Sequence, residues 1–406
     1  MPAVRESLAS FCLVALAACS GRSSSSLPPM SGNAIENASM EARVAAHWVH
    51  TAVPALSNIG NDLLSIRGFS PSNIYAAGLT ETPVIAHWNG SSWARMSLAL
   101  PGAHTVRLVT VGGSTPADLW VAGNEPEGSQ QAPVPVSFHL QSGIWRKEVL
   151  PRLPSGFSGS VDAIKALNAT DAFALLDIIN FSTASEKPFV ARWNGARWTN
   201  VPVPAPNIND AGFDTRIGGL DATSGSDAWL VGFVPDLPAP LGFIEHFNGT
   251  SWRQVPLPAI PVQGSDGEEL DGVYARTVND AWAVGAVWIG SSPGAQMQRT
   301  LTLHWNGTRW AYVQSPSYGS ISTINILNAV SGDGLSNDVW AVGTANDKLP
   351  LAMKWNGAAW SFPESPASFA DGALDAVAVF APQNVWAVGT DDDTEDRVPL
   401  ADHYTP

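Results

Sequence analysis

Residues 305–310 read WNGTRW, and the same pattern returns along the chain about every fifty residues. Further copies are WNGSSW at 88–93, WNGARW at 193–198 and WNGAAW at 355–360, with the variant FNGTSW at 247–252 and the degenerate LQSGIW at 140–145. Asn-Gly between two alternating apolar runs is the strongest short signal for a β-hairpin, because both residues tolerate positive φ. A hexapeptide repeated this often is either a set of ligand sites or part of a repeating structural unit.

A second motif indicates that the repeat is structural. An Asn or Asp, a spacer, an aromatic residue and a short apolar run occur seven times, and Gly closes six of the copies. The third copy, DAFALL from Asp171, has Leu176 in place of that Gly. The aromatic residues lie 45 to 58 residues apart, at Tyr75, Trp120, Phe173, Trp229, Trp282, Trp340 and Trp386.

Each unit contains four short segments with strand character, which we call a to d in chain order. A turn ending in the Asx joins a to b, a variable loop joins b to c, and the Asn-Gly turn joins c to d. Four antiparallel strands per unit, repeated seven times, indicate an all-β fold, the seven-bladed β-propeller. The last unit ends at ADHYTP without a strand d, whereas the segment around Trp48 resembles one. We expect this N-terminal strand to close the last blade, which leaves the ring without a free edge.

Repetition in every unit favours a packing role for the repeated side chains. We expect the two Trp of each WNGxxW to form a cross-strand aromatic pair or to pack against the next blade. A basic residue occupies one position of strand c in all seven units, and we expect it to bind the Asx of an a–b turn, in its own or a neighbouring blade. These residues are His87, His139, Arg192, His246, His304, Lys354 and His403. A zinc site is disfavoured, because its ligands must converge and these are spread around a ring.

The N-terminus has the features of an export signal. MPAVRESLASFCLVALAAC combines Arg5 with an apolar run from Leu8 to Ala18 that is too short to span a bilayer. LAAC at 16–19 resembles the lipobox of bacterial lipoproteins. This resemblance implies removal of residues 1–18 and diacylation of Cys19. Ser20 then implies outer-membrane sorting in a Gram-negative host, with the soluble domain in the periplasm or at the cell surface. The alternative is an ordinary signal peptide with an incidental Cys.

The remaining chain divides into a tether and one repeat domain. Residues 19–40 are rich in Ser and Pro and are expected to form a flexible tether before the propeller at 41–406. Cys12 and Cys19 are the only cysteines, so the processed chain would contain no disulfide.

Charge and motifs limit the classes of function. The formal net charge of −15 argues against nucleic acid as a partner and against an anionic lipid surface, so the membrane is contacted through the lipid anchor only. Signatures of common enzymes (GxSxG, HExxH, the P-loop, the dinucleotide fingerprint) do not occur. We therefore expect a monomeric binding module whose ligand is a glycan or an envelope protein. The alternative is a polysaccharide-acting glycoside hydrolase or lyase, with carboxylates converging near the central channel.

The variable connections are the expected location of binding residues. The a–b and c–d turns are short and repeated, whereas the b–c and d–a loops open on the opposite face and vary in length. Candidate ligand contacts there are Trp288, Tyr318, Asp266, Glu268 and Glu269. The acidic loop TDDDTEDRVP suggests calcium as a cofactor, through Asp391, Asp392, Asp393, Glu395 and Asp396. The alternative is a solvated acidic loop without metal, because EF-hand spacing is missing; no other cofactor is expected.

The WAVG and WNGxxW repeats together resemble those of uncharacterised bacterial surface propellers. This resemblance covers nearly all of the processed chain and implies an architecture without an activity. More weakly, the chain is similar to tectonin-like lectin propellers, which share an aromatic-Val run followed by a Trp-led strand. The expected Asx–basic contacts resemble in logic the structural His/Asp networks of WD40 propellers, although the WD40 motifs themselves do not occur.

Overall fold

A computed structural model describes residues 46–57, 61–80, 82–102, 105–127, 132–183, 185–204, 215–235, 239–290, 297–319, 323–346, 349–363, 372–391 and 398–406. The chain divides into residues 1–43 and a compact unit of residues 44–406. The predicted signal peptide, Cys19 and the predicted tether lie outside the described residues. The described part of the chain holds no helix with the length and hydrophobicity needed to cross a bilayer.

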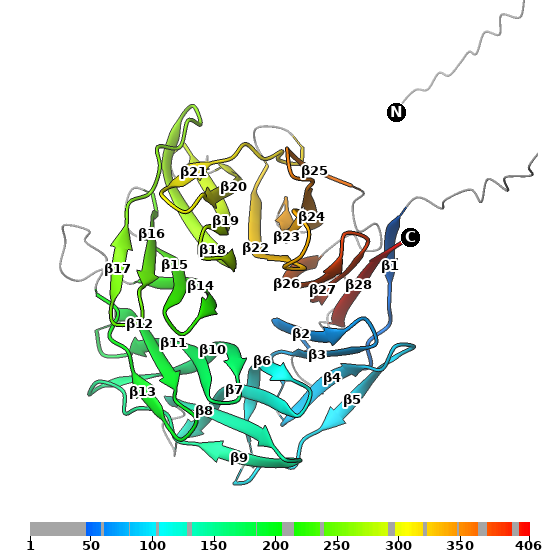
Figure 1. Ribbon diagram of the computed structural model, residues 1–406, viewed down its shortest axis with the longest axis vertical. Helices are drawn as coiled ribbons and strands as arrows, with labels where there is room; N and C mark the ends of the chain where they lie inside the picture. Colours follow the sequence, from blue (N-terminus) through cyan, green and yellow to red (C-terminus); the bar gives the residue numbers. More distant parts are fainter. Residues whose placement is uncertain are drawn as a thin grey trace, which may run out of the picture. The chain divides into compact units, whose positions relative to one another are not determined.

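The 44–406 unit is a ring of seven four-stranded antiparallel sheets, as predicted (Figure 1). In blades 1 to 6 the first strand in chain order faces the ring axis and the last lies outside, whereas in blade 7 β26 faces the axis and β1 lies outside. Blades 1 to 3 are β2 (Ser65–Ser70), β3 (Asn73–Ala77), β4 (Val84–Trp88), β5 (Trp93–Ser97); β6 (Arg107–Thr115), β7 (Asp118–Glu127), β8 (Ala132–Gln141), β9 (Ile144–Glu148); and β10 (Phe157–Asn168), β11 (Asp171–Asn180), β12 (Ser185–Trp193), β13 (Trp198–Asn200). Blades 4 to 6 are β14 (Arg216–Ser224), β15 (Asp227–Val234), β16 (Leu241–Phe247), β17 (Trp252–Val255); β18 (Ser265–Thr277), β19 (Asp280–Ile289), β20 (Met297–Trp305), β21 (Trp310–Tyr312); and β22 (Asn325–Gly332), β23 (Val339–Ala345), β24 (Leu349–Trp355), β25 (Trp360–Ser361).

Blade 7 confirms the predicted closure of the ring. It consists of β26 (Gly372–Ala381), β27 (Asn384–Asp391), β28 (Val398–Thr405) and the N-terminal strand β1 (His47–His50). Trp48 pairs with Tyr404 in register, and the Thr51 N–H donates to the carbonyl of Ala401 at 2.9 Å. The first described strand therefore supplies the outer strand of the last blade, beside the C-terminus (Figure 1).

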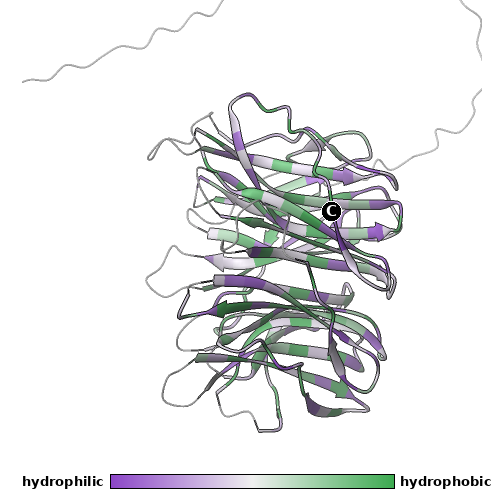
Figure 2. Ribbon diagram, turned by 90° about the vertical axis from the view of Figure 1, so that its left-hand side faces the viewer, coloured by the Kyte–Doolittle hydropathy of each residue, from purple (hydrophilic) through white to green (hydrophobic). Residues whose placement is uncertain are grey.

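The apolar core is divided among the interfaces between blades. Seven clusters of buried side chains occur, one for each pair of neighbouring blades. In side view, hydrophobic residues are accordingly spread along the strands that face the viewer and alternate with hydrophilic ones (Figure 2). Each blade therefore covers its apolar faces with both of its neighbours, and closure of the ring provides both neighbours for every blade.

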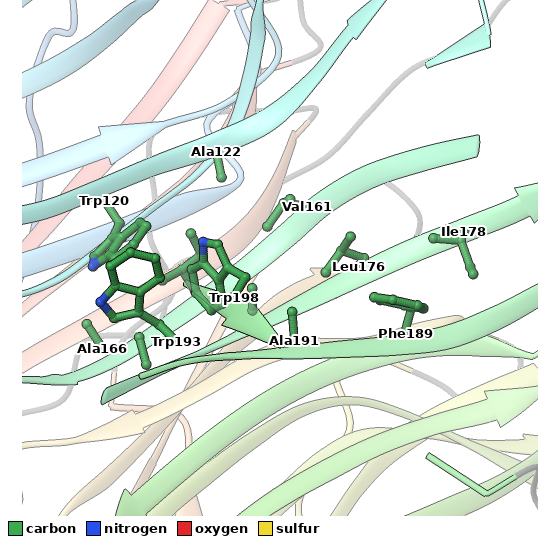
Figure 3. Close-up of a cluster of buried hydrophobic side chains, with 13 residues drawn as sticks. Trp120, Ala122, Val161, Ala166, Leu176, Ile178, Phe189, Ala191, Trp193 and Trp198 are labelled. Atoms are coloured by element: carbon green, nitrogen blue, oxygen red, sulfur yellow. The ribbon is translucent and has the colours of Figure 1, made fainter. Parts of the chain in front are cut away.

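The repeated tryptophans make these interfaces. Trp193 and Trp198 pair across strands β12 and β13 with 5.7 Å between ring centroids. Both also contact Trp120 of the preceding blade, at 5.3 and 5.0 Å (Figure 3). Both expected packing modes therefore occur together. The same trio recurs where the pairs Trp88–Trp93, Trp305–Trp310, Trp355–Trp360 and Trp48–Tyr404 pack on Trp386, Trp229, Trp282 and Trp340.

The Asn-Gly turns form the predicted hairpins by a different mechanism. Trp88 pairs with Trp93, so four residues form the loop, and Gly90 has a φ of 98°. Among the described non-glycine residues, positive φ occurs only at Ser142 and Asn346, so Asn89 has an ordinary conformation. Its side-chain Oδ1 instead accepts the N–H groups of Ser91 and Ser92, each at 3.0 Å. The repeated Asn is therefore needed as an acceptor within the turn.

All seven predicted Asx–basic pairs form, each within its own blade. The donor–acceptor distances run from 2.5 Å for His139–Asp118 to 3.1 Å for Lys354–Asp338. The other five pairs are His87–Asn73, Arg192–Asp171, His246–Asp227, His304–Asp280 and His403–Asn384. Each basic group also lies over the strand-b aromatic ring; the imidazole of His139 stacks on Trp120 at 3.7 Å. We call these seven pairs the Asx–basic ring.

Candidate functional site

The a–b and c–d turns lie on one face of the propeller, as predicted. The indole Nε1 of Trp88 donates to the carbonyl of Pro71 in the a–b turn at 3.1 Å. Trp193 and Trp305 make the same 3.1 Å bond to Ala169 and Val278. These bonds join the two turns of a blade, so strand a ends at the face on which the Asx–basic ring lies.

Strand a carries one residue per blade that pairs directly with the strand-b aromatic. These residues, which we call the inner ring, are Arg67, Gly112, Lys165, Asp221, Tyr274, Ser331 and Ala378. No two of them are of the same type. Because the backbone position is equivalent in all seven blades, packing alone does not account for this variety. The inner ring is therefore a candidate for ligand recognition.

Five members of the inner ring line one cavity of about 530 Å³. Arg67, Lys165, Asp221, Tyr274 and Ser331 reach it from five different blades, at the end of strand a nearest the a–b turns. A cavity of this size lies within the range of small-ligand and peptide side-chain sites. We call it the channel-mouth cavity.

Asp221 is the electrostatic centre of the cavity. One carboxylate oxygen accepts Lys165 Nζ at 2.5 Å, and the other accepts the N–H of Ala275 at 2.8 Å. Burial lowers the pKa of Arg67, and the charge of Asp221 partly offsets this effect. Burial and the same charge raise the pKa of Tyr274 to about 12, so its hydroxyl stays protonated. The cavity is thus lined by charges of both signs beside a neutral phenol.

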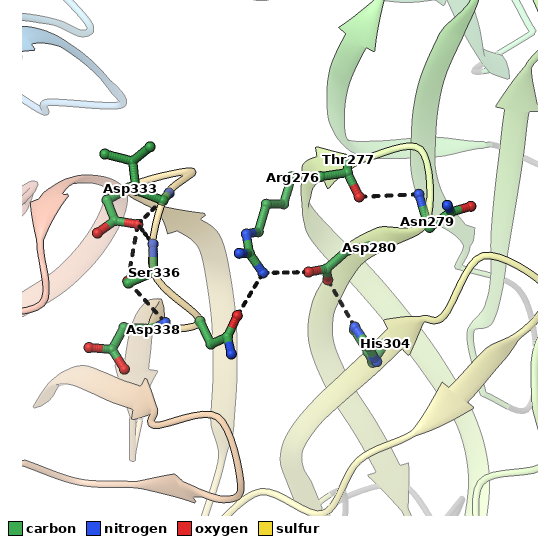
Figure 4. Close-up of polar contacts among 10 residues, drawn as sticks. Arg276, Thr277, Asn279, Asp280, His304, Asp333, Ser336 and Asp338 are labelled. Carbon is green, nitrogen blue, oxygen red and sulfur yellow. Dashed lines mark hydrogen bonds and ion pairs between the residues drawn. The ribbon is translucent and has the colours of Figure 1, made fainter.

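The rim of the cavity is held by polar contacts between blades 5 and 6. Arg276 Nη1 donates to Asp280 Oδ2 at 2.8 Å and to Asn337 Oδ1 at 3.0 Å (Figure 4). Hydrogen bonds from His304 and Arg276 hold the pKa of Asp280 below its usual range, although burial opposes them. In the next turn Asp333 Oδ1 accepts the N–H groups of Leu335 and Ser336, at 2.9 and 2.7 Å (Figure 4). This rim is therefore fixed before any ligand binds.

Four of the residues predicted to contact ligand lie in strands, where loops were expected. Asp266, Glu268 and Glu269 belong to β18, and Trp288 belongs to β19, because both strands extend beyond the repeated motif. Glu269 is buried and accepts Gln298 Nε2 at 2.9 Å. Burial raises the pKa of Glu269 to about 7, and the nearby Trp288 indole opposes this rise. Asp266 is exposed, whereas Glu268 and Trp288 are half-buried; the role of these residues in binding stays a prediction.

Tyr318 is exposed, as a contact residue should be. It lines an apolar cavity of about 140 Å³ together with Leu349, Pro350 and Phe362. Its ring lies 6.3 Å from that of Phe362 in an edge-on arrangement. A cavity of this size has room for one apolar side chain, on the face predicted for binding.

The predicted calcium site falls mostly outside the described residues. Asp392, Asp393, Glu395 and Asp396 are not among them, while Asp391 is buried at the end of β27. In the described part of the chain, no three His, Cys, Asp or Glu side chains are placed to hold a metal ion. Calcium binding by this loop stays a prediction.

Two carboxyl groups of strand a are relevant to the hydrolase alternative. Asp162 and Asp271 occupy bulges of β10 and β18. Burial and the charge of Glu269 raise the pKa of Asp271 well above its usual range. Desolvation and repulsion from Asp177 raise the pKa of Asp162 to about 7. A glycosidase combines a protonated carboxyl with an ionised one. The pKa values of both of these groups are raised, so neither is held in the ionised form.

The inner ring is a candidate site that the sequence reasoning missed. Each member lies eight residues before the strand-b aromatic of its blade, except in blade 6, where Ser331 lies nine residues before Trp340. This spacing was a usable signal, but a search for repeated residue types passes over a position at which every type differs. The channel-mouth cavity also opens on the face of the a–b and c–d turns, whereas binding was expected on the opposite face.

Comparison with known proteins supports the fold. No family model matches the chain, and no curated protein matches its sequence. The structure of YCF48 bound to D1 peptide is similar, with a TM-score of 0.52 and 15% identity, over 88% of this chain and 97% of that one. The WD40 β-propeller domain of Doa1 gives a TM-score of 0.52 at 9% identity, over 87% of this chain and 96% of that one. At these identities the likeness shows the propeller fold alone.

Proposed function

We propose that this protein is an exported, lipid-anchored interaction module that binds a segment of another envelope protein at the channel-mouth cavity. The observation that carries the proposal is the contrast between the repeated Asx–basic ring and the unrepeated inner ring. A rigid ring presents five inner-ring side chains, each from a different blade and each of a different type, to one cavity. Because every inner-ring residue is different, this arrangement is better suited to one ligand with several different groups than to identical ligands bound once per blade.

The tryptophans favour a protein ligand over a glycan. Glycan sites commonly use exposed aromatic faces, yet none of the 17 tryptophans, all of which are described, is exposed. The exposed aromatic residues among the described ones are Phe181 and Tyr318. The channel-mouth cavity offers charged groups of both signs, which complement peptide groups and charged side chains. YCF48 binds a D1 peptide on the same fold, which is in keeping with a peptide ligand here.

Binding is tested with the soluble chain from residue 23 on a random-peptide library and on a glycan array, with and without calcium. We expect selection of peptides and no glycan signal. Ser331→Trp fills the cavity and should abolish peptide binding, whereas Thr308→Trp, in an exposed c–d turn, should not. Glycan binding that Ser331→Trp leaves unchanged would contradict the proposal, and binding that needs calcium would shift attention to the acidic loop.

The lipid anchor is tested with the two cysteines of the chain as a matched pair. Metabolic labelling with a palmitate analogue should mark the wild-type protein and Cys12→Ser but not Cys19→Ser. Loss of label in both variants, or in neither, would contradict lipidation at Cys19. Sorting to the outer membrane is tested by density fractionation of the labelled protein.

A polysaccharide hydrolase or lyase remains the second candidate because of Asp271. Its raised pKa and its neighbour Glu269 are features of a general acid. Release of reducing or unsaturated ends from envelope polysaccharides, lost in Asp271→Asn, would favour the enzyme. We expect no such release.

A further inference from the structure

One cation of the channel-mouth cavity has no acceptor. The described residues provide no hydrogen bond and no ion pair to the guanidinium of Arg67, and its Nε is buried. Its contact is with the Phe69 ring, 5.1 Å away. Arg67 is half-buried, and its Nε is buried without a hydrogen-bond partner, which costs free energy because that N–H has lost water. Among the described residues the guanidinium therefore has donors left over for an acceptor that enters the cavity.

The other charged groups of the cavity are already committed. Both oxygens of Asp221 are occupied, by Lys165 and by the Ala275 N–H. Arg276 is bonded to Asp280 and Asn337, and Asp333 accepts three bonds from its own turn. Arg276 also keeps a buried Nε without a partner, but its Nη1 is bonded, whereas no atom of the Arg67 guanidinium has an acceptor among the described residues that line the cavity.

The chemistry of the cavity favours a carboxylate as the missing group. A guanidinium matches a carboxylate with two parallel N–H···O bonds, which is a strong and directional contact. Asp221 and Asp333 line the same cavity and would repel a dianionic phosphate more than a monoanion. The protonated phenol of Tyr274 adds no negative charge at neutral pH.

We propose that Arg67 binds a carboxylate of the peptide ligand in the channel-mouth cavity, through the open guanidinium edge. This proposal rests on the proposed function and specifies the group that is recognised. The carboxylate belongs either to the C-terminus of the partner or to an Asp or Glu side chain. Both sources present the same chemistry to Arg67.

The experiment uses acetylated tetrapeptides and the same soluble chain, which begins at residue 23. Four peptides of one parent sequence combine a free or amidated C-terminus with a Glu or Gln side chain. Sodium acetate is the smallest carboxylate probe, and sodium chloride at the same concentration is its control. Binding is followed by thermal shift and by titration calorimetry. We expect at least one carboxylate-bearing peptide to bind, and the doubly neutral peptide to bind at least tenfold more weakly. The pattern among the four identifies the source of the carboxylate.

Arg67→Met separates recognition from a structural role. Because it removes a buried Nε that has no partner, the variant should melt at the same temperature as the wild type or higher, yet lose the preference for carboxylates. Arg107→Met, on an exposed arginine at the opposite end of strand β6, should keep that preference. A lower melting temperature with preserved preference would overturn the proposal. Equal binding of all four peptides would overturn it while leaving peptide binding intact, and failure of every peptide would count against both.

Discussion

The inner ring and the basic residues of the Asx–basic ring flank the same seven strand-b aromatic residues, the former on strand a and the latter on strand c. The basic residues repeat one chemical class, whereas the inner-ring residues do not repeat. Trp120 pairs with Gly112 on β6 and with His139 on β8, and the same geometry recurs in each blade. On the outer side all seven residues are basic and bonded to an Asx. On the inner side all seven types differ. Equivalent backbone positions therefore carry the same side chain only where each blade has the same structural requirement.

The comparison predicts that the outer pairs support the fold. Asp118→Ala would leave the fully buried Nε2 of His139 without an acceptor and would also remove bonds to Ser114. Burial lowers the pKa of His139, so the variant leaves a neutral imidazole and the Ser114 groups without their acceptor, at a cost of about 3 kcal/mol of unfolding free energy. Asp338→Ala removes a partly exposed contact with Lys354 and should cost about 1 kcal/mol. Urea unfolding measures both, and an unchanged midpoint for Asp118→Ala would contradict a structural role.

Glu245 tests whether a residue that does not repeat can still affect stability. It lies on strand c, directly before His246, at a buried position. The matching residue of strand c is Ala, Phe, Leu or Met in five blades. Glu245 is fully buried, and neither carboxyl oxygen has a partner among the described residues. Burial raises its pKa to about 7. The folded state therefore holds the proton more tightly than the unfolded chain, and stability falls as pH rises from about 4.5 to about 7.

Glu245→Gln should remove this fall, and Glu245→Leu should stabilise the protein above pH 7. The gain is at most about 3 kcal/mol, from a shift of two to three pKa units. Unfolding free energies measured from pH 4 to 8 test this, with Asp266→Asn on an exposed carboxyl as the control. If Glu245→Gln keeps the pH dependence of the wild type, another group is responsible.

The smallest effect on stability is expected inside the inner ring. Ser331→Ala removes a hydroxyl for which no repeated structural bond exists, so the change in unfolding free energy should stay within about 0.5 kcal/mol. Its effect should instead appear in peptide affinity, measured by calorimetry. A loss of stability comparable to that of Asp118→Ala would erase the distinction between the two rings.

The fold was predictable because its determinants are repeated. Seven Asx-aromatic motifs with WNGxxW turns predict blade number and strand order, and the missing last strand predicts closure by Trp48; the structure confirms each. The seven Asx–basic contacts were also predictable, since the same two residue types stand at the same two positions. Only the turn mechanism was wrong: Asn89 acts through its side chain, and Gly90 alone takes the positive φ.

The site was not predictable by the same reasoning. Which strand-a residue faces the ring axis depends on bulges, such as that between Leu270 and Gly272, and one extra residue changes the face to which a side chain points. Trp288 and Glu269 were assigned to loops because they lie beyond the repeated motif, although strand pairing continues there. The absence of a partner for Arg67 depends on side chains from several blades, which no local pattern contains.

Photo-crosslinking in cells tests the central claim most directly. A benzophenone amino acid is placed at Ala378, in the inner ring, or at Ala358, in an exposed c–d turn of the Asx–basic face. The account predicts a discrete protein adduct from position 378 and none from position 358. An adduct from position 358, with none from position 378, would show that the partner binds elsewhere and that the inner ring is not the recognition site.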